Sequence, residues 1–239
     1  MRLIKPYYEI ESEIDGEKIL RHIESAARTC YKSEDKINDF EKTKKFVRGL
    51  INGGHHSTIE HYSISVRFII DRGVSHELVR HRLCAFSQES TRYCNYSNEK
   101  YGDDITFIIP SWLNLEEGIY NKIQQRDNDN YYIWNGNEIL LDKQTISYLQ
   151  ALKYSELYYK DLISKGWVAQ QARSVLPNSL KTEIVTTCNL REWRHIFGMR
   201  AVGVAGKPHP QMLEVMVPLL EEFKQKIPII FDDLKIKEM

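Results

Sequence analysis

The sequence contains few cysteines, and their spacing argues against two common kinds of small-protein scaffold. There are four, Cys30, Cys84, Cys94 and Cys188, and none belongs to a C-x-x-C pair. Zinc knuckles and disulfide frameworks both depend on closely spaced cysteines, so neither is expected. We expect four free thiols, most of them packed against other side chains.

The chain also lacks an excess of charge of either sign. Lysine and arginine together number 33, and aspartate and glutamate together number 33. A balanced chain creates no broad basic field that would attract nucleic acid or an anionic membrane, so an anion-binding site must be local. We therefore expect a protein that binds neither nucleic acid nor membrane.

Long apolar segments are missing as well. No run approaches the roughly 20 apolar residues that a transmembrane helix needs. The opening residues, "MRLIKPYYEI", lack the apolar core and the small-residue cleavage site of a signal peptide. These two absences predict a cytoplasmic protein.

The familiar phosphate-binding motifs are absent too. No G-x-G-x-x-G follows a predicted strand, and "GKPHP" has neither the preceding glycine spacing nor the Ser or Thr of a P-loop. A nucleotide bound by this chain would have to be held in another way.

The hydrophobic pattern predicts helices and strands in a single domain over residues 1–239. With 42% hydrophobic residues, a chain of 239 residues can bury a substantial core. Helical spacing of apolar residues, or alternation typical of strands, distinguishes the two kinds of element. Helices are expected at 17–32, 41–54 and 76–84, within 167–177 with a stop ahead of Pro177, from Asn189 onward and around 212–223. Residues 137–165 form one long helix or a broken pair. Strands are expected at 61–68, 104–110 and 181–189, and loops at 97–104, 124–130 and 203–210.

Together these elements predict an α+β fold, with a mixed, largely antiparallel sheet and flanking helical bundles. Ser75 is expected to cap the helix at 76–84, which places Arg80 and Arg82 near its end. The apolar stripe from Met212 to Phe223 is typical of a core or a subunit interface.

The stretch "RHRLCAFSQESTRY" concentrates hydrogen-bond donors within fourteen residues. Arginine is always charged and binds phosphate oxygens in pairs, and nearby hydroxyl groups add short donors. Arg80, Arg82, Ser90 and Arg92 could therefore cradle a nucleotide phosphate. A solvated basic face is the simpler alternative, because charge clustering alone indicates an anion and no particular reaction.

Two other kinds of site can be considered near this stretch. "GHHSTIEHYS" contains His55, His56 and His61, but they lack the four-residue helical spacing of a familiar metal pair, so no metal site is predicted. Cys84 lies close to two arginines that would lower the pKa of a thiol, yet nothing marks it as a nucleophile. Packing is the better interpretation of Cys84.

Five motifs, in order along residues 55–212, resemble those of the flavin-dependent thymidylate synthases. "RHR", seven further residues, a serine and "TRY" match the family's signature. "GHHSTIEH" resembles its Gly-His-x-Ser/Thr-x-x-Glu-His element, and "ARSVLP" its arginine before Leu-Pro. "NLR" and "MRA…HPQM" resemble its Asn-x-Arg and its C-terminal arginine. Agreement of five ordered motifs is far more specific than agreement of one.

This resemblance implies a reaction, a set of small molecules and an assembly. The reaction would be the reductive methylation of dUMP to dTMP, with methylenetetrahydrofolate as the carbon donor, FADH2 as the hydride donor and NADPH as the reductant of the flavin. The family forms a homotetramer whose sites combine residues of several subunits. An α+β fold with a mixed sheet and helical bundles would again be expected.

The resemblance also implies roles for individual residues. Positions that contact or lie near FAD correspond to His55, Ser57, Glu60, Arg80, His81, Arg82, Gln88, Asn189, Arg191 and His195. Positions around dUMP correspond to Glu77, Arg80, Gln88, Ser90, Arg92, Arg173 and Arg200. Arg200 would be the catalytic residue, because a fixed cation there would favour ionisation of the pyrimidine at N3 without a covalent enzyme adduct.

Some positions depart from the family's pattern, and two other functions stay open. Glu77 and Gln88 stand where relatives often carry Gln and Glu, and His195 stands where relatives can carry Asn. A flavin- or nucleotide-binding module without turnover would share the same phosphate donors. An RNA-binding protein is the third possibility, but it would need a broader basic surface with interleaved aromatic residues.

Overall fold

The computed structural model describes residues 1–36, 39–98, 102, 104–126 and 129–236, and of residues 122–126 and 129–132 it describes the backbone only. The chain divides into two compact units. Unit 1 comprises Met1–Pro6, Ile69–His76 and Gln88–Ile184, and unit 2 comprises Tyr7–Phe68, Glu77–Ser87 and Val185–Met239. The prediction of a single domain over residues 1–239 stays a prediction.

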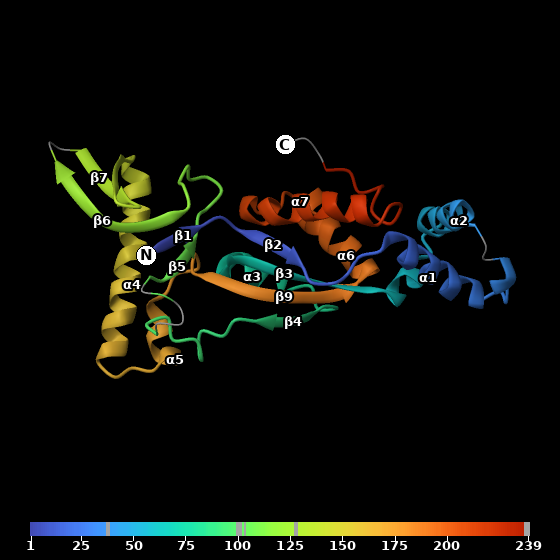
Figure 1. The fold of residues 1–239 in the computed structure, drawn as a ribbon, viewed down its shortest axis with the longest axis horizontal. Coiled ribbons are helices and arrows are strands. Elements are labelled where there is room, and N and C mark those ends of the chain that lie inside the picture. Colours follow the sequence, from blue (N-terminus) through green and yellow to red (C-terminus); the bar gives the residue numbers. More distant parts are fainter. Residues whose placement is uncertain (37–38, 99–101, 103, 127–128, 237–239) are drawn as a thin grey trace. The chain divides into compact units, whose positions relative to one another are not determined.

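The predicted α+β class is confirmed, but the strands form two sheets and not one (Figure 1). One sheet has the order β5-β1-β6-β7-β8, and the other has the order β2-β3-β9-β4. Pro6 lies between β1 and β2 and has no amide hydrogen to continue a ladder, which explains why neighbouring strands join different sheets. The strands are β1 (Arg2–Ile4), β2 (Tyr7–Ile10), β3 (Ser63–Asp71), β4 (Ala85–Gln88), β5 (Thr106–Ile108), β6 (Gly118–Arg126), β7 (Asp129–Trp134), β8 (Asn137–Leu140) and β9 (Lys181–Asn189).

The five-stranded sheet supports the core of unit 1. β1 pairs in parallel with β5 and antiparallel with β6, and the later pairs are antiparallel. The long helix α4 (Lys143–Ser164) contributes Leu149, Leu152 and Tyr159 to this core, all of them buried. Burying such side chains stabilises the folded state by about 1.5–3 kcal/mol each.

Helix α4 resolves one sequence expectation. Residues 137–165 are neither a helix throughout nor a broken pair of helices, because 137–140 form β8 and one uninterrupted helix begins at Lys143. Asp142 sets that start, since its carboxylate accepts a hydrogen bond from the backbone N–H of Thr145 at 2.9 Å.

The expected loop at 124–130 is wrong for the residues that the structure describes. β6 extends to Arg126 and β7 begins at Asp129, whereas 127–128 lie outside the described residues. Side-chain polarity suggested a loop, but ladder hydrogen bonds join backbone groups and tolerate polar side chains on a hairpin. Of the expected loop at 97–104, positions 99–101 and 103 also lie outside the described residues.

The expected helix at 167–177 is also wrong in its length. Only α5 (Ala169–Ala172) is α-helical, and a 3₁₀ turn follows over Arg173–Val175. Leu176 is extended, with ψ of 134°. A residue that precedes proline disfavours the helical region, so the predicted stop ahead of Pro177 is confirmed at Leu176.

In unit 2 the first two helices follow the sequence expectation closely. They are α1 (Gly16–Thr29) and α2 (Phe40–Asn52), which lie side by side (Figure 1). Asp15 and Asp39 cap them by accepting hydrogen bonds from backbone N–H groups of their first turns. Short 3₁₀ turns follow each helix, η1 (Glu34–Lys36) after α1 and η2 (His56–His61) after α2.

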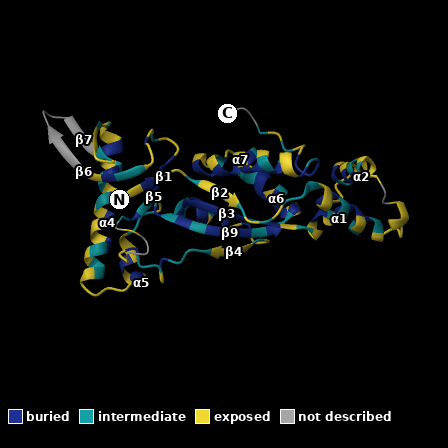
Figure 2. Cartoon of the chain, viewed as in Figure 1, coloured by how far each residue is buried: buried dark blue, intermediate teal, exposed yellow. Residues whose placement is uncertain are grey.

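The last two helices build the aromatic core of unit 2. They are α6 (Leu190–Phe197) and α7 (Pro210–Lys226). Trp193, Phe197, Phe223 and Phe231 pack with ring centroids 5.3–5.6 Å apart. Figure 2 shows buried residues along α7, and every member of the predicted apolar stripe from Met212 to Phe223 is buried. The stripe is therefore core within this chain, and it supports no subunit contact.

The helix expected at 76–84 is wrong in both of its ends. α3 spans Arg72–Leu78, because Asp71 accepts the N–H of Val74 at 2.6 Å and so caps the helix four residues before Ser75 could. The hydroxyl of Ser75 instead donates to the carbonyl oxygen of Arg72 inside the helix. No helix of the described residues is long and apolar enough to cross a bilayer.

Candidate active site

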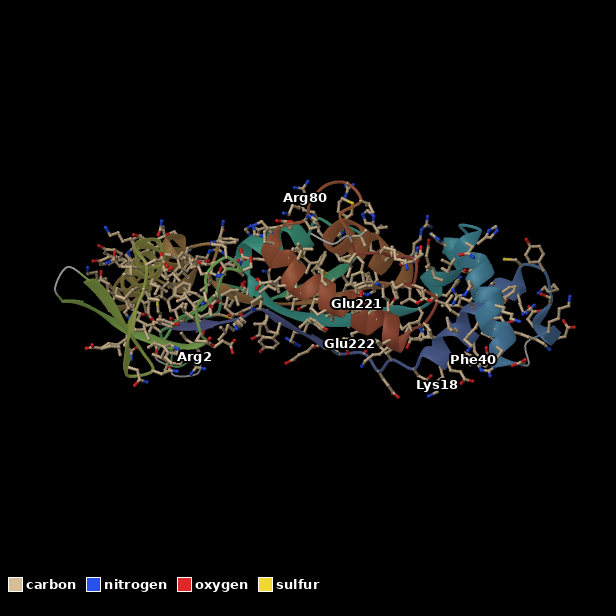
Figure 3. The ribbon with its side chains drawn as sticks, turned by 90° about the horizontal axis from the view of Figure 1, so that it is seen from above. Arg2, Lys18, Phe40, Arg80, Glu221 and Glu222 are labelled. Atoms are coloured by element: carbon tan, nitrogen blue, oxygen red, sulfur yellow. The ribbon has the colours of Figure 1, made fainter. Side chains whose placement is uncertain are left out.

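The signature residues Arg80, His81 and Arg82 lie in a tight turn and not on a helix. Backbone bonds from His81 to Leu78 and from Cys84 to His81 span three residues each and close this turn. Arg80 and Arg82 are exposed, whereas His81 is only 6% exposed. Figure 3 shows Arg80 directed away from the ribbon. The turn thus presents two guanidinium groups outward and one imidazole inward.

His81 is a neutral base in this environment. Burial lowers the pKa of His81 to about 4, and the charge of Arg200 and the nearby His195 act in the same direction. The rings of His81 and His195 lie edge to face, with centroids 5.4 Å apart. At neutral pH His81 therefore carries one proton, on one of its two ring nitrogens.

Arg200 lies on a π-helical turn, η5 (Gly198–Val202), that directly follows α6. The expected helix from Asn189 thus changes its hydrogen-bonding pattern before it reaches Arg200, as often happens at functional sites. Gly203 ends the turn with φ of 76°, and a Cβ there would lie 2.8 Å from the carbonyl oxygen of Gly206. Only glycine fits this position, so the backbone beyond Arg200 is specified by the sequence.

The guanidinium group of Arg200 is hydrogen-bonded to two residues, Glu77 at the end of α3 and His81 in the turn that follows α3. Nη1 donates to Oε2 of Glu77 at 2.6 Å, and Nη2 donates to the carbonyl oxygen of Glu77 at 3.2 Å. Nε donates to Nε2 of His81 at 3.2 Å. Three nitrogens of one side chain are therefore fixed in direction.

Arg200 and Glu77 line a cavity of about 350 Å³. Lys207 and His209, from the segment before α7, line it too. Sequence reasoning did not single out Lys207, because a lysine in a Gly- and Pro-containing loop resembles an ordinary solvated residue. The cavity places a second cation near Arg200.

A second group of predicted residues lies around η2 and the start of α6. His55 and Ser57 are exposed, and the carboxylate of Glu60 forms an ion pair with Arg191. Asn189 caps α6, since its side-chain oxygen accepts the N–H of Glu192 at 2.9 Å. The predicted start of this helix is thus confirmed, and Glu60 and Arg191 are brought together from distant positions in the sequence.

The other predicted residues belong to unit 1. Gln88 donates through Nε2 to the hydroxyls of Ser75, at 2.9 Å, and Thr182, at 3.2 Å. Ser90 accepts the backbone N–H of Arg92 at 3.3 Å, which shapes the turn that follows it. The exposed guanidinium of Arg92 lies 5.3 Å from the ring centroid of Tyr93.

Arg173 lines a cavity of about 420 Å³ in unit 1. Its Nη1 donates to the hydroxyl of Thr91 at 3.0 Å, and Thr91, His76 and Arg72 line the same cavity. One nitrogen of Arg72, Nη1, is buried without a hydrogen-bond partner among the described residues. This cavity combines two guanidinium groups with a hydroxyl, a donor set suited to an anion.

One cluster of side chains has the composition of a metal site. Ligand atoms of His81, Glu192 and His195 lie within 4.8 Å of one another. It differs from the histidines that sequence reasoning weighed as metal ligands. However, Nε2 of His81 already accepts the N–H of Arg200, so a neutral His81 carries its proton on Nδ1, the nitrogen that faces Glu192. A metal would compete with that proton at Nδ1 and with the N–H of Arg200 at Nε2, so the arrangement disfavours a metal.

The cysteines are free thiols, as the sequence predicts. Burial raises the pKa of the Cys188 thiol, and its contact with Cys84 adds to this effect. A thiol with a raised pKa stays protonated and is a poor nucleophile. Packing is thus the role that the geometry gives to Cys188.

A comparison with known protein families shows which family this chain belongs to. A sequence model described as thymidylate synthase complementing protein matches residues 15–229. The chain belongs to the thymidylate synthase complementing protein family. The resemblance inferred from the five motifs is therefore confirmed.

Individual members of this family are similar over most of the chain. A flavin-dependent thymidylate synthase of Corynebacterium efficiens is 32% identical over 219 residues, which cover 91% of this chain and 80% of that protein. The enzyme of the same name from Mycobacterium tuberculosis is 29% identical over 94% of this chain and 82% of its own length.

A solved structure shows the same fold. The UMP/dUMP methylase PolB from Streptomyces cacaoi, bound with 5-Br dUMP, superposes with a TM-score of 0.73 over 97% of this chain and 96% of that chain. At 19% sequence identity, this likeness supports the fold alone.

Proposed function

We propose that this chain catalyses the reductive methylation of dUMP to dTMP. The observation that carries this proposal is the fixed guanidinium of Arg200, held by Glu77 and His81 at the wall of a cavity. Family membership and the relatives named flavin-dependent thymidylate synthase support the same reaction. The methyl carbon would come from methylenetetrahydrofolate.

The proposed role of Arg200 is electrostatic. A preorganised cation stabilises negative charge that develops in the transition state and needs no reorganisation at that moment. On dUMP, this cation favours ionisation at N3, which makes the pyrimidine ring nucleophilic without a covalent bond to the protein. The bonds from Arg200 to Glu77 supply the required fixed direction.

The phosphate of dUMP is assigned to the arginines of unit 1. Arg92 is exposed, and Arg173 lines a cavity beside the hydroxyl of Thr91. Guanidinium groups bind phosphate oxygens with charge-assisted hydrogen bonds. Ser90 and Gln88 are further dUMP residues in this proposal, as are Glu77 and Arg80.

The donor set of unit 2 fits the diphosphate and flavin of FAD. The guanidinium groups of Arg80 and Arg82 have no hydrogen-bond or ion-pair partner within the described part of the chain, so both are available to an anion. The remaining proposed FAD residues of unit 2 are His55, Ser57, Glu60, His81, Asn189, Arg191 and His195, and Gln88 of unit 1 is assigned to FAD as well. When bound, the reduced flavin supplies the hydride, and NADPH is the proposed source of its electrons.

The proposed assembly is a homotetramer in the cytoplasm, with sites shared between subunits. This proposal rests on the family resemblance alone. The apolar stripe of α7, which could have been a subunit interface, is buried within the chain and gives no support to it. Light scattering with an absorbance spectrum tests it. A stable monomer that binds FAD normally would contradict the shared sites.

One experiment separates this enzyme from a flavin- or nucleotide-binding module without turnover. Purified protein is incubated with FAD, NADPH, methylenetetrahydrofolate and [5-³H]dUMP, and released tritium and dTMP are measured together. We expect both products in equal amounts, and no dTMP if NADPH or methylenetetrahydrofolate is omitted, or if the protein is first stripped of FAD and none is added. A yellow protein that binds dUMP but forms no dTMP would instead be the binding module.

A further inference from the structure

The orientation of Arg200 depends on His81, and His81 depends on a carboxylate with no assigned role. This carboxylate belongs to Glu192, on the first turn of α6. Glu192 is 6% exposed, and its own backbone N–H is fixed by the side chain of Asn189. The three side chains Glu192, His81 and Arg200 form a connected series.

The first link fixes the protonation of His81. A guanidinium N–H can only donate, and Nε of Arg200 points at Nε2 of His81 from 3.2 Å. Nε2 must therefore be the unprotonated nitrogen of the neutral ring. The single proton of His81 is consequently on Nδ1.

The second link explains why this tautomer is favoured. Nδ1 of His81 lies 3.6 Å from Oε1 of Glu192, and both side chains are buried. A carboxylate attracts an N–H and repels a lone pair, more strongly in a buried site than in water. The other titratable groups that act here are His195, beside both side chains, and Arg200.

We propose that Glu192 is a positioning residue for catalysis: its carboxylate holds His81 in the Nδ1–H tautomer, so that Nε2 accepts Arg200 and orients its guanidinium. The inference rests on the proposed role of Arg200 in methylating dUMP. Without the carboxylate, His81 can place its proton on Nε2. Two N–H groups then face each other, and Arg200 loses one of its two partners.

The test compares three variants of the FAD-loaded enzyme. Glu192→Gln keeps the size of the side chain but offers an N–H as well as an oxygen, and Glu192→Asp keeps the charge. Glu221→Gln is the matched control, since Glu221 is exposed on α7 and labelled in Figure 3. Tritium release gives kcat and the KM for dUMP, and urea unfolding reports stability.

We expect Glu192→Gln to lower kcat about tenfold or more, as for loss of an oriented electrostatic partner, with the KM for dUMP changed less than about twofold. Glu192→Asp should recover part of kcat, and Glu221→Gln should match the parent enzyme. An unchanged kcat in Glu192→Gln would overturn the proposal. A loss of stability that accounts for all of the lost activity, with no recovery in Glu192→Asp, would assign Glu192 a structural role only.

The tautomer is measured without turnover. Solid-state ¹⁵N NMR of protein labelled at histidine distinguishes protonated from unprotonated ring nitrogens, and the His81→Asn spectrum assigns the signals. We expect Nδ1–H at His81 in the parent and a shift toward Nε2–H in Glu192→Gln. An Nε2–H tautomer of His81 in the parent would refute the positioning role of Glu192, even if the protein methylates dUMP. Conversely, an inactive parent with the expected tautomers would contradict the proposed function alone.

The same preparations test the metal alternative. If His81, Glu192 and His195 bind a divalent cation, Zn²⁺ added to the enzyme is retained at one equivalent per chain and is lost in Glu192→Gln. That result would replace the positioning role. We expect no Zn²⁺ retention that depends on Glu192.

Discussion

Arg200 makes two hydrogen bonds to Glu77, one to its carboxylate at 2.6 Å and one to its backbone carbonyl oxygen at 3.2 Å. The first belongs to an ion pair whose side chains are 20% and 34% exposed. The second cannot be removed by changing the side chain. The two acceptors together define the plane of the guanidinium, and only one of them can be tested by substitution.

Glu77→Ala should lower kcat about tenfold, which corresponds to about 1.4 kcal/mol in the activation free energy. The reason is that Nη1 of Arg200 loses its acceptor and the guanidinium can rotate. Glu77→Gln keeps an acceptor oxygen and should stay within about threefold of the parent. Tritium release from [5-³H]dUMP measures both. Equal losses in the two variants would mean that charge, and not direction, is what Glu77 contributes.

Arg200→Ala should retain FAD and lose turnover by about two to three powers of ten, the cost of removing a preorganised donor. Arg200→Lys keeps the charge but cannot reproduce three directed N–H groups, so it should recover only part of the rate. FAD absorbance and tritium release are measured on the same samples. Full activity in Arg200→Ala would remove the proposed catalytic role.

Arg92→Ala should weaken dUMP binding by roughly one to two powers of ten, because a charge-assisted contact is worth about 1.5–3 kcal/mol. FAD should stay bound. Arg2→Ala is the control, since Arg2 is also exposed in unit 1 and has no proposed role (Figure 3). Calorimetric titration with dUMP gives the affinities. Loss of FAD with unchanged dUMP affinity would show that Arg92 is assigned to the wrong ligand.

A variant with Cys30, Cys84, Cys94 and Cys188 all changed to Ala should still methylate dUMP if it folds. Electrostatic activation needs no thiol, and the raised pKa of Cys188 disfavours a thiolate. The expected cost is in stability, about 1–3 kcal/mol in total for small core changes. An inactive but folded and FAD-loaded variant, rescued by restoring one cysteine, would indicate covalent chemistry.

His81 should make the folded state less stable as the pH falls. Its pKa is lowered from 6.5 to about 4, so the unfolded chain binds a proton more readily than the folded one between these values. The contribution of His81 to the free energy of unfolding is therefore complete above about pH 6.5. It falls by up to about 3 kcal/mol as the pH drops to about 4. Glu192 acts in the opposite direction, because burial raises its pKa.

The measurement is therefore a difference between proteins. Urea unfolding of the parent and of His81→Asn is compared at several pH values, with His76→Asn as the exposed-histidine control. The slope of stability against pH should flatten in His81→Asn only. If stability depends on pH in the same way in the parent and in His81→Asn, the pKa of His81 is not lowered and another group causes the pH dependence.

Local signals in the sequence were enough to predict several elements and the family. Strand β9 coincides with the predicted residues 181–189, and the helix cap at Asn189 was correctly predicted. Both depend on nearby residues: β-branched side chains in the strand, and one side-chain oxygen at the helix start. The ordered motifs identified the family because each is a short run of residues, readable without knowledge of contacts.

Competition between local signals misplaced other elements. The sequence predicts Ser75 as a helix cap, but the structure uses Asp71, so α3 begins at Arg72 and ends at Leu78, before Arg80. The tertiary structure alone decides where this helix lies. For the same reason the π turn that carries Arg200 could not be foreseen, since its backbone pattern depends on packing beyond the turn.

By itself, the sequence determined which residue types are present and which ordered motifs identify the family. The need for glycine at position 203 comes from the structure, because φ of 76° there is costly for a residue with a side chain. The tertiary structure alone decided that Glu192 faces His81 and that His81 accepts Arg200. His81 and Arg200 are 119 positions apart in the sequence, and His81 and Glu192 are 111 positions apart. No local pattern relates residues at such separations, so their meeting follows only from the folding of α6 against the turn that contains His81.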